Sequence, residues 1–272
     1  MILIDDVQIN LGNFPDGTML VKYEPLIEQL VHGAKIEWKY ENDTELLGLI
    51  YLVKHLRAFG VEELYLHMPY IPNARQDRVK TYEDIFTLKY FAEIINSLKF
   101  DKVHVLDPHS TVAEALIDRI VVETPKYYVV EVLERIAPWR HHDRSKKSVT
   151  MFYPDEGASK RYRDLVNLPY AFGIKRRDWE TGKILGLDVA DYNDAIMGKD
   201  ILIVDDICSR GGTFLHAAKK LKDLGAKDIY LFVSHCENTI LEGELLTSGL
   251  IKKVYTSDSI FTKEHELIEV LK

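Results

Sequence analysis

Short apolar runs rich in strand-forming residues alternate along this chain with stretches of helical periodicity, and this order constrains the fold more than any other feature. Residues 44–59 and 87–98 place apolar side chains at spacings typical of one helix face. Strands that alternate with helices of about 10–15 residues are typical of βαβ units and therefore of a parallel sheet. The predicted strands are Leu64–Met68, Val103–Leu106, Val149–Tyr153, Ile201–Val204, Ile229–Val233 and Val254–Tyr255.

The length of 272 residues exceeds the roughly 100–200 residues of an ordinary domain, so we expect two domains. The most polar stretch near the middle, Pro138–Lys147, separates two sets of strands and helices, and the domain change is expected between Val122 and the end of that stretch. We predict domains at 1–124 and 125–272. We interpret His141–Asp143 as part of a solvated loop, because adjacent side chains in a loop rarely converge on one metal ion.

The charge balance argues against one class of partner. Lys+Arg number 35 and Asp+Glu 43, for a net charge of −8, whereas proteins that bind nucleic acid non-specifically normally carry an excess of positive charge. No run of about 18 apolar residues is present to span a membrane, and no basic-then-apolar leader opens the sequence. Cys208 and Cys236 form neither a disulfide framework nor a CxxC pair. We expect a cytoplasmic protein with no nucleic-acid or membrane partner.

The strongest local signal is the segment Ile201–Thr213, in which a predicted buried strand ends in two carboxylates and a short loop ends in Gly-Gly-Thr. Gly211 and Gly212 let backbone N–H groups approach an anion without a Cβ in the way, and the N-terminus of the following helix favours that anion. Asp205 and Asp206 lie where open α/β sheets bind ligands, and they can accept hydrogen bonds from two vicinal sugar hydroxyls. The segment therefore predicts a phosphosugar site.

The helix after this segment has apolar residues on one face. We expect Thr213 to cap its start and Gly225 to follow its end. A glycine pair alone would be typical of an ordinary strand–turn–helix, so the prediction depends on the strand, the acidic pair and the Gly-Gly-Thr together.

These residues resemble the ribose-5-phosphate loop of the type I phosphoribosyltransferase fold, which phosphoribosyltransferases share with ribose-phosphate pyrophosphokinases (PRPP synthetases). Other segments match the pyrophosphokinases better. Pro69–Arg78 resembles their Pro-Tyr-x-x-x-Ala-Arg-Gln-Asp-Arg segment, which contacts ATP and which the transferases lack. Val105–His109 is similar to the family's Val-Asp-Leu-His, whose histidine helps to hold Mg-ATP.

Three more segments carry the resemblance. Tyr153–Ala158 resembles the family's Pro-Asp-x-Gly-Gly, with Ala158 at the second glycine. Gly173–Arg177 ends in the Lys-x-Arg found at the root of the family's flexible catalytic loop, which predicts a closing lid. Phe14–Thr18 resembles Phe-x-Asp-Gly-Glu, which stacks on adenine across a subunit interface in the family, with Thr18 in place of the glutamate.

The resemblance implies an α/β fold of two tandem phosphoribosyltransferase-like domains, each a mainly parallel sheet flanked by helices. It places ATP on the N-terminal domain and ribose phosphate on the C-terminal domain. It also implies transfer of the β,γ-diphosphoryl group of ATP to the C1 hydroxyl of ribose 5-phosphate, giving PRPP and AMP, with Mg²⁺ as cofactor, in a homodimer or larger homo-oligomer. By matching position, Lys175 and Arg177 would be catalytic and His109 and Asp155 would serve the metal; ATP would contact Phe14, Asp16, Arg75, Gln76, Asp77 and His109, and ribose phosphate would contact Asp205, Asp206, Ser209, Arg210, Gly211, Gly212 and Thr213.

The sequence departs from the family's Asp-Asp-x-x-Asp/Ser-Thr-Gly-Gly-Thr at Arg210, which stands where threonine is usual. An arginine adds a permanently charged fork beside the expected phosphate. It could hold a monophosphate more tightly, reach a second phosphate as in ADP-ribose, or point to solvent. The second of these possibilities leaves open the same chemistry on ADP-ribose. Two further alternatives stay open: a phosphoribosyltransferase, which would not need the Ala-Arg-Gln-Asp-Arg and Asp-Pro-His segments, and a catalytically silent regulatory homologue, against which the intact His109, Asp155, Lys175 and Arg177 argue.

Overall fold

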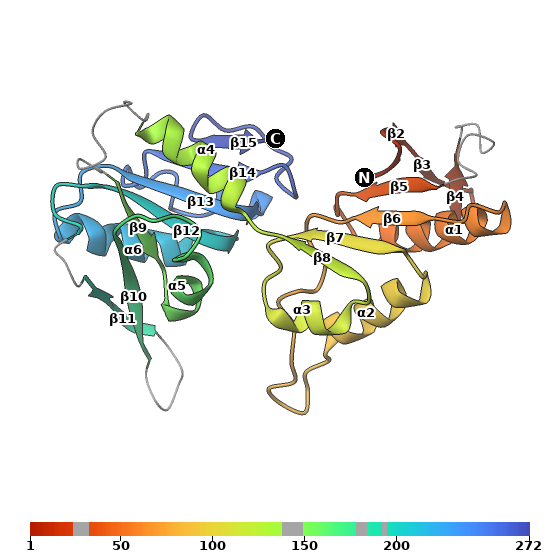
Figure 1. The fold of residues 1–272 in the computed structure, drawn as a ribbon, viewed down its shortest axis with the longest axis horizontal. Coiled ribbons are helices and arrows are strands. Elements are labelled where there is room, and N and C mark those ends of the chain that lie inside the picture. Colours follow the sequence, from red (N-terminus) through yellow and green to blue (C-terminus); the bar gives the residue numbers. More distant parts are fainter. Residues whose placement is uncertain (24–32, 138–148, 178–183, 192–194) are drawn as a thin grey trace. The chain divides into compact units, whose positions relative to one another are not determined.

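The structure, a computed structural model, describes residues 1–23, 33–137, 149–177, 184–191 and 195–272 (Figure 1). The polar stretch Pro138–Lys147, with its His141–Asp143 triplet, lies outside these residues. Within the described ranges, no helix is long and apolar enough to cross a membrane. The chain divides into two compact units, unit 1 at Met1–Thr124 and unit 2 at Pro125–Lys272.

Unit 1 is an α/β unit with the elements β1 (Ile2–Ile4), β2 (Val7–Gln8), β3 (Asn10–Asn13), β4 (Met19–Lys22), β5 (Ala34–Trp38), α1 (Thr44–Ala58), β6 (Leu64–His67), α2 (Thr87–Ser97), β7 (Lys102–Leu106), α3 (Thr111–Leu116) and β8 (Ile120–Glu123). Its main sheet has the order β2-β1-β5-β6-β7-β8. The strands from β5 to β8 are parallel, and β1 is antiparallel to both of its neighbours. Strands β3 and β4 form a separate antiparallel hairpin. Helices α2 and α3 lie side by side below β7 and β8 in Figure 1.

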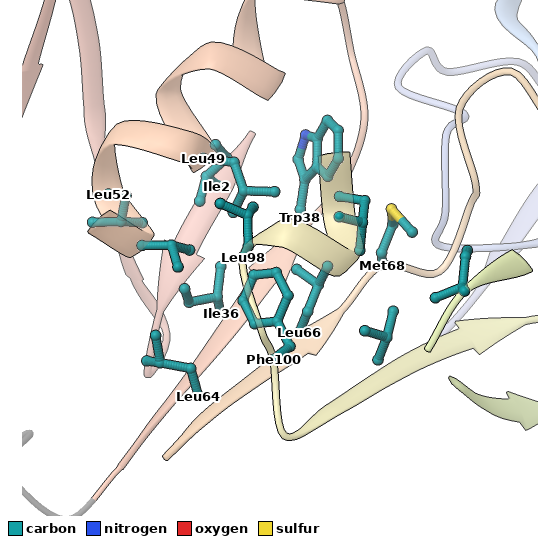
Figure 2. Close-up of a cluster of buried hydrophobic side chains, with 14 of the residues drawn as sticks. Ile2, Ile36, Trp38, Leu49, Leu52, Leu64, Leu66, Met68, Leu98 and Phe100 are labelled. Atoms are coloured by element: carbon teal, nitrogen blue, oxygen red, sulfur yellow. The ribbon is translucent and has the colours of Figure 1, made fainter. Parts of the chain in front are cut away.

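The apolar core of unit 1 follows from strand alternation. Leu64 and Leu66 on β6 are fully buried, and the residues between and after them point to the other face of the sheet. Trp38 at the end of β5 is also fully buried, and its indole Nε1 donates a hydrogen bond to the buried carboxylate of Glu45 on α1 at 3.0 Å. Figure 2 shows the surrounding cluster, to which β5, β6 and α1 all contribute.

Unit 2 contains α4 (Lys126–Ile136), β9 (Val149–Tyr153), α5 (Glu156–Tyr162), β10 (Tyr170–Arg177), β11 (Ile184–Ala190), β12 (Asp200–Cys208), α6 (Gly212–Asp223), β13 (Ile229–Cys236), the 3₁₀ helix η2 (Asn238–Glu242), β14 (Lys253–Ser257) and β15 (Ile268–Leu271). Its sheet has the order β11-β10-β9-β12-β13-β14-β15. Every neighbouring pair is parallel except β10 and β11, which form an antiparallel hairpin. Helix α4 lies across β14 in Figure 1.

Both faces of the unit 2 sheet are covered, so its central strand β12 carries a continuous apolar run from Ile201 to Val204. Ile201 and Ile203 belong to the apolar layer that includes α6, whereas Leu202 and Val204 belong to the layer that includes α4 and α5. All four side chains are fully buried. A continuous apolar run is what a parallel strand between two helical layers requires.

The predicted fold class, α/β with mainly parallel sheets flanked by helices, is confirmed. The helices predicted over 44–59 and 87–98 are α1 and α2, and all six predicted strands are present. Strand β12 is longer than predicted and continues to Cys208. Strand β5 was missed, because Lys35 and Glu37 interrupt its apolar residues and hide the strand in the sequence.

Candidate active site

In unit 1, the loops that follow β6 and β7 leave the same edge of the sheet, because neighbouring parallel strands end together. A backbone hydrogen bond joins them: Leu106 N–H donates to the carbonyl oxygen of Pro69 at 3.1 Å. We call residues 69–78 and 107–110 the unit 1 loops. They contain Arg75, Gln76, Asp77 and His109, the charged and polar residues that we predicted to contact ATP.

Asp77 is buried in these loops and is held by its neighbour. The guanidinium of Arg78 donates from Nε at 2.7 Å and from Nη2 at 2.8 Å to the two carboxylate oxygens of Asp77. These hydrogen bonds lower the pKa of Asp77 to about 2, and Ser110 and the charge of His109 act in the same direction. Asp77 and His109 therefore lie in one electrostatic neighbourhood, and the Asp77–Arg78 pair fixes the shape of the loop.

Arg75, Gln76 and His109 are exposed on the unit 1 loops. Thr87, the first residue of α2, donates from Oγ1 to Oε1 of Gln76 at 2.8 Å and ties the loop to that helix. Asn73 turns the chain ahead of them at a positive φ of 63°, a conformation that asparagine adopts more readily than most residues. The loops thus present a guanidinium, an amide and an imidazole to solvent at one edge of the sheet.

The turn between β3 and β4 presents an aromatic ring. Phe14 is 49% exposed at this turn. The carboxylate of Asp16 accepts hydrogen bonds from Oγ1 of Thr18 at 2.7 Å and from its N–H at 3.0 Å, and these bonds lower the pKa of Asp16. Thr18, which stands in place of the glutamate of the resembled motif, therefore locks Asp16 into the turn.

In unit 2, the turn from β12 into α6 depends on glycine. Gly211 is the N-cap of α6 and has a φ of +76°. A Cβ at this position would also stand 2.8 Å from the side chain of Leu245. The prediction that Thr213 caps the helix is wrong: α6 begins at Gly212, and its N-cap makes no side-chain hydrogen bond, so no side chain of the cap occupies its first N–H groups. Gly225 does follow the end of α6, at a φ of +84°.

Acidic side chains gather beside this turn. The N–H of Asp206 donates to Oδ1 of Asp205 at 3.0 Å. Burial raises the pKa of Asp205 well above its usual range, and the negative charges of Asp206 and Asp155 raise it further. Asp155 is the N-cap of α5 and accepts a hydrogen bond from the N–H of Ala158 at 3.0 Å. Carboxylates in this arrangement favour ligands that donate hydrogen bonds or carry positive charge.

Comparison with known proteins finds similar chains. The ribose-phosphate pyrophosphokinase of Saccharolobus solfataricus is 25% identical over 271 residues, which cover 97% of this chain and 88% of that protein. The ribose-phosphate pyrophosphokinase of Bradyrhizobium diazoefficiens is 30% identical over 223 residues, covering 79% of this chain and 66% of that protein. The crystal structure of phosphoribosylpyrophosphate synthetase from Mycobacterium smegmatis matches the fold with a TM-score of 0.76, at 19% identity, over 98% of this chain and 87% of that chain.

The chain belongs to the ribose-phosphate pyrophosphokinase family. No protein-family model matches it, so its membership rests on these relatives together with the two-sheet fold.

The Lys-x-Arg segment of this pyrophosphokinase family member lies on the hairpin of unit 2. Lys175 pairs with Leu187, and Arg177 pairs with Ile184 after a register shift between residues 176 and 177. Residues 178–183, which the sequence assigned to a lid, lie outside the described residues. The backbone of both basic residues is thus at the end of β10, next to the start of β11.

Arg210, the residue at which this chain departs from the family motif, forms an ion pair with Glu242. The guanidinium of Arg210 donates from Nη2 to Oε2 of Glu242 at 2.8 Å, and both side chains are exposed. The neighbouring Ser209 shares a hydrogen bond of 3.2 Å with Thr239, also on η2. Two side chains of the 3₁₀ helix η2, Thr239 and Glu242, therefore hold Ser209 and Arg210, which lead into α6.

The family motifs name one metal residue in each unit, His109 in unit 1 and Asp155 in unit 2. Among the residues described, no three His, Cys, Asp or Glu side chains lie close enough to hold an ion by themselves. Mg²⁺ prefers oxygen ligands, keeps several waters and is commonly shared with substrate phosphates. In unit 2 the carboxylate of Asp155 is half-buried and has the ligand chemistry that Mg²⁺ prefers, and in unit 1 the imidazole of His109 is exposed.

Two side chains at the candidate site were missed in the sequence. Arg161 of α5 carries its Nη1 atom 3.9 Å from Oδ2 of Asp206. Glu242 holds Arg210, as described above. Neither residue belongs to a motif recognised in the sequence. Each is separated from its partner by more than 30 residues along the chain, so only the fold brings the two partners together.

Proposed function

We propose that this protein transfers the β,γ-diphosphoryl group of ATP to the C1 hydroxyl of ribose 5-phosphate, giving PRPP and AMP. The observation that carries the proposal is the Asp205–Thr213 segment, in which two acidic residues on β12 precede the glycine-capped N-terminus of α6. The N–H groups of a helix N-terminus bind phosphate, and adjacent carboxylates accept hydrogen bonds from ribose hydroxyls. The name of the similar proteins, ribose-phosphate pyrophosphokinase, supports the same chemistry.

In this proposal unit 2 holds the acceptor. The backbone N–H groups of Gly211, Gly212 and Thr213 bind the 5′-phosphate, with help from Ser209. Asp205 and Asp206 accept hydrogen bonds from the 2- and 3-hydroxyls and so orient the C1 hydroxyl. Phosphoryl transfer needs mainly alignment and charge stabilisation, which a rigid strand end and helix start provide.

Unit 1 holds the nucleotide in this proposal. Arg75 and Gln76 contact ATP from the unit 1 loops, while Asp77 supports them through its ion pair with Arg78. The exposed ring of Phe14 stacks on adenine, and Asp16 keeps the turn that carries this ring in shape. His109 of unit 1 and Asp155 of unit 2 are the residues that would contact Mg²⁺, which would neutralise charge on the phosphate oxygens of ATP when bound.

The reaction moves one group. The oxygen of the C1 hydroxyl bonds to the β-phosphorus, the bond from that phosphorus to the oxygen that bridges to the α-phosphate breaks, and AMP leaves with that oxygen. The hydroxyl proton passes to solvent. Lys175 and Arg177 neutralise the negative charge that grows on the β-phosphoryl group and on the leaving oxygen.

The test is to mix the purified protein with ATP, Mg²⁺ and ribose 5-phosphate and to follow AMP and PRPP by chromatography and ³¹P NMR. Stoichiometric formation of AMP and PRPP is the expected result. A phosphoribosyltransferase would instead consume PRPP with a nucleobase and release diphosphate. A silent regulatory homologue would give no product from either mixture, and either outcome would overturn the proposal.

A second candidate acceptor is ADP-ribose, which offers the same C1 hydroxyl with a longer 5′ substituent. The observation that favours it is the exposed guanidinium of Arg210, held by Glu242 beside the start of α6. Such a fork is suited to a second phosphate. In this case Arg210→Thr should lower kcat/KM for ADP-ribose by roughly 10- to 150-fold and for ribose 5-phosphate far less. The reverse pattern would assign Arg210 to the monophosphate, and equal small losses would remove the argument for ADP-ribose.

We also propose that the protein acts as a homodimer or larger homo-oligomer. Leu47 and Tyr51, four residues apart on α1, are exposed apolar side chains, as is Phe59 just after the helix, and another copy could cover them. Sedimentation equilibrium over a range of concentrations measures the assembly. A monomer at all concentrations would overturn this part of the proposal.

A further inference from the structure

Arg161, a half-buried residue of α5, lies near Asp206 of the acidic pair of unit 2. Its Nη1 atom lies 3.9 Å from Oδ2 of Asp206, and the two side chains are 30% and 8% exposed. The guanidinium also lies over the ring of Tyr162, with its central carbon 5.2 Å from the ring centroid. The face of this aromatic ring attracts the cation and favours an orientation of the guanidinium near Asp206.

The position of Asp206 requires a counter-charge. Asp206 is a buried residue of β12 that follows the apolar part of this strand and lies next to Asp205, and the negative charge of Asp155 acts on that neighbour. A buried carboxylate among other carboxylates is costly unless a cation or hydrogen-bond donors compensate it. Leu202 and Val204 place the even-numbered positions of β12 in the layer of α5, which is the helix that carries Arg161. The fold therefore brings the compensating cation from that layer.

We propose that Arg161 is a positioning residue for the acceptor: its guanidinium holds the carboxylate of Asp206 in the orientation that accepts hydrogen bonds from the vicinal hydroxyls of a sugar phosphate. This inference rests on the proposed function of unit 2. Arg161 acts through Asp206 and does not itself contact the reacting atoms. It therefore affects acceptor binding and leaves nucleotide binding, which we assign to unit 1, unchanged.

The first experiment compares Arg161→Gln with wild type. We expect the KM for ribose 5-phosphate to rise roughly tenfold and the KM for Mg-ATP to stay within about twofold. Arg163→Gln is the matched control, because Arg163 follows directly after α5 and its Nε atom lies 3.8 Å from the exposed Asp164. The control is expected to keep both KM values. An unchanged acceptor KM in Arg161→Gln, or an equal rise in both KM values, overturns the inference.

A double-mutant cycle separates positioning from a merely structural role. Asp206→Asn and the combined variant Arg161→Gln/Asp206→Asn are measured together with Arg161→Gln. If Arg161 acts through Asp206, its substitution adds less than about twofold to the acceptor KM once Asp206 is replaced. Independent, multiplying losses would mean that Arg161 acts elsewhere and would overturn the inference.

Arg161→Lys keeps the inference testable even if the glutamine variant folds poorly. Lysine preserves the charge but loses the planar fork, so we expect a rise of only about threefold in the acceptor KM at an unchanged KM for Mg-ATP. A rise in both KM values, or in neither, counts against Arg161 as a positioning residue.

Calorimetric binding of ribose 5-phosphate and of ADP-ribose to wild type distinguishes failure of the proposed function from failure of this inference alone. Wild type that binds neither and forms no AMP overturns the proposed function and this inference together, whereas active wild type with an unaffected Arg161→Gln variant overturns the inference alone.

Discussion

The carbonyl oxygen of Arg210 packs against Gly243 so closely that a Cβ at position 243 would stand 1.9 Å from it. Gly243 directly follows η2, the element whose Glu242 also binds the guanidinium of Arg210. Backbone and side chain of Arg210 are thus both held by the same short segment. The segment that leads into α6 is fixed from a part of the chain more than 30 residues further on.

Gly243→Ala should therefore disturb the candidate acceptor site. Because Cβ atoms do not approach a carbonyl oxygen this closely, the backbone of η2 or of Arg210 must move, and we expect a loss of about 1–3 kcal/mol in the free energy of unfolding together with a raised acceptor KM. Thermal unfolding and steady-state rates measure the two effects. Gly12→Ala, where the nearest atom to a new Cβ is 4.0 Å away, is the control. Equal behaviour of the two variants would show that the contact is not a constraint.

Asp77→Asn should weaken unit 1 in a pH-dependent way. The pKa of Asp77 falls from 3.8 to about 2 in the folded protein, so its ion pair contributes stability that is present above pH 3.8 and is lost as the pH falls through 2. After allowance for the exposed Arg78, we expect Asp77→Asn to cost about 1–2 kcal/mol at pH 7. Denaturant unfolding at pH 7 and at pH 3, with Glu83→Gln as an exposed control, checks this. A cost that did not shrink at the lower pH would contradict it.

Asp205→Asn should make the protein more stable and less able to bind its acceptor. Burial raises the pKa of Asp205, so the ionised carboxylate costs stability at pH 7, and this cost disappears as the pH falls toward 3.8. We expect Tm to rise by about 2–4 °C at pH 7 and the difference from wild type to narrow as the pH is lowered. The KM for the acceptor should increase at least about tenfold. A lower Tm in Asp205→Asn, with Asp223→Asn unchanged, would mean that the ionised carboxylate is stabilised in the fold.

Lys175→Ala should lower kcat by roughly 10²–10³ with a modest change in either KM, as for the loss of one group that stabilises charge in the transition state. Arg176→Ala, at the variable position of the Lys-x-Arg segment, is the matched control and should keep most of its activity. Rapid-quench measurement of AMP formation reports the chemical step. Turnover near that of wild type at saturating substrates would remove Lys175 from the mechanism.

His109→Ala should raise the KM for Mg-ATP by several-fold more than the KM for the acceptor, because His109 belongs to the unit 1 loops, next to Asp77. Titration of both substrates at fixed free Mg²⁺ measures the two constants, and removal of Mg²⁺ by a chelator should abolish turnover. A variant in which only the acceptor KM rises would reverse our assignment of substrates to units.

The sequence was sufficient wherever the structural cause is local. The Asp205–Thr213 segment could be recognised because an apolar strand, an acidic pair and two glycines follow one another without a gap. The cap of α6 was predicted wrongly, because Gly211 provides it through backbone conformation rather than through a side chain that a pattern would reveal. The pairing of Arg161 with Asp206 was out of reach, since it depends on how α5 packs against β12.

The alternation along β12 has a consequence for how such a site can change. Leu202 and Val204 serve one apolar layer, and Ile201 and Ile203 serve the other. Insertion or deletion of one residue in this strand would exchange the two layers and at the same time turn Asp206 away from α5. The packing of the core and the orientation of the acidic pair therefore depend on the same strand register, so a change of register cannot alter one without the other.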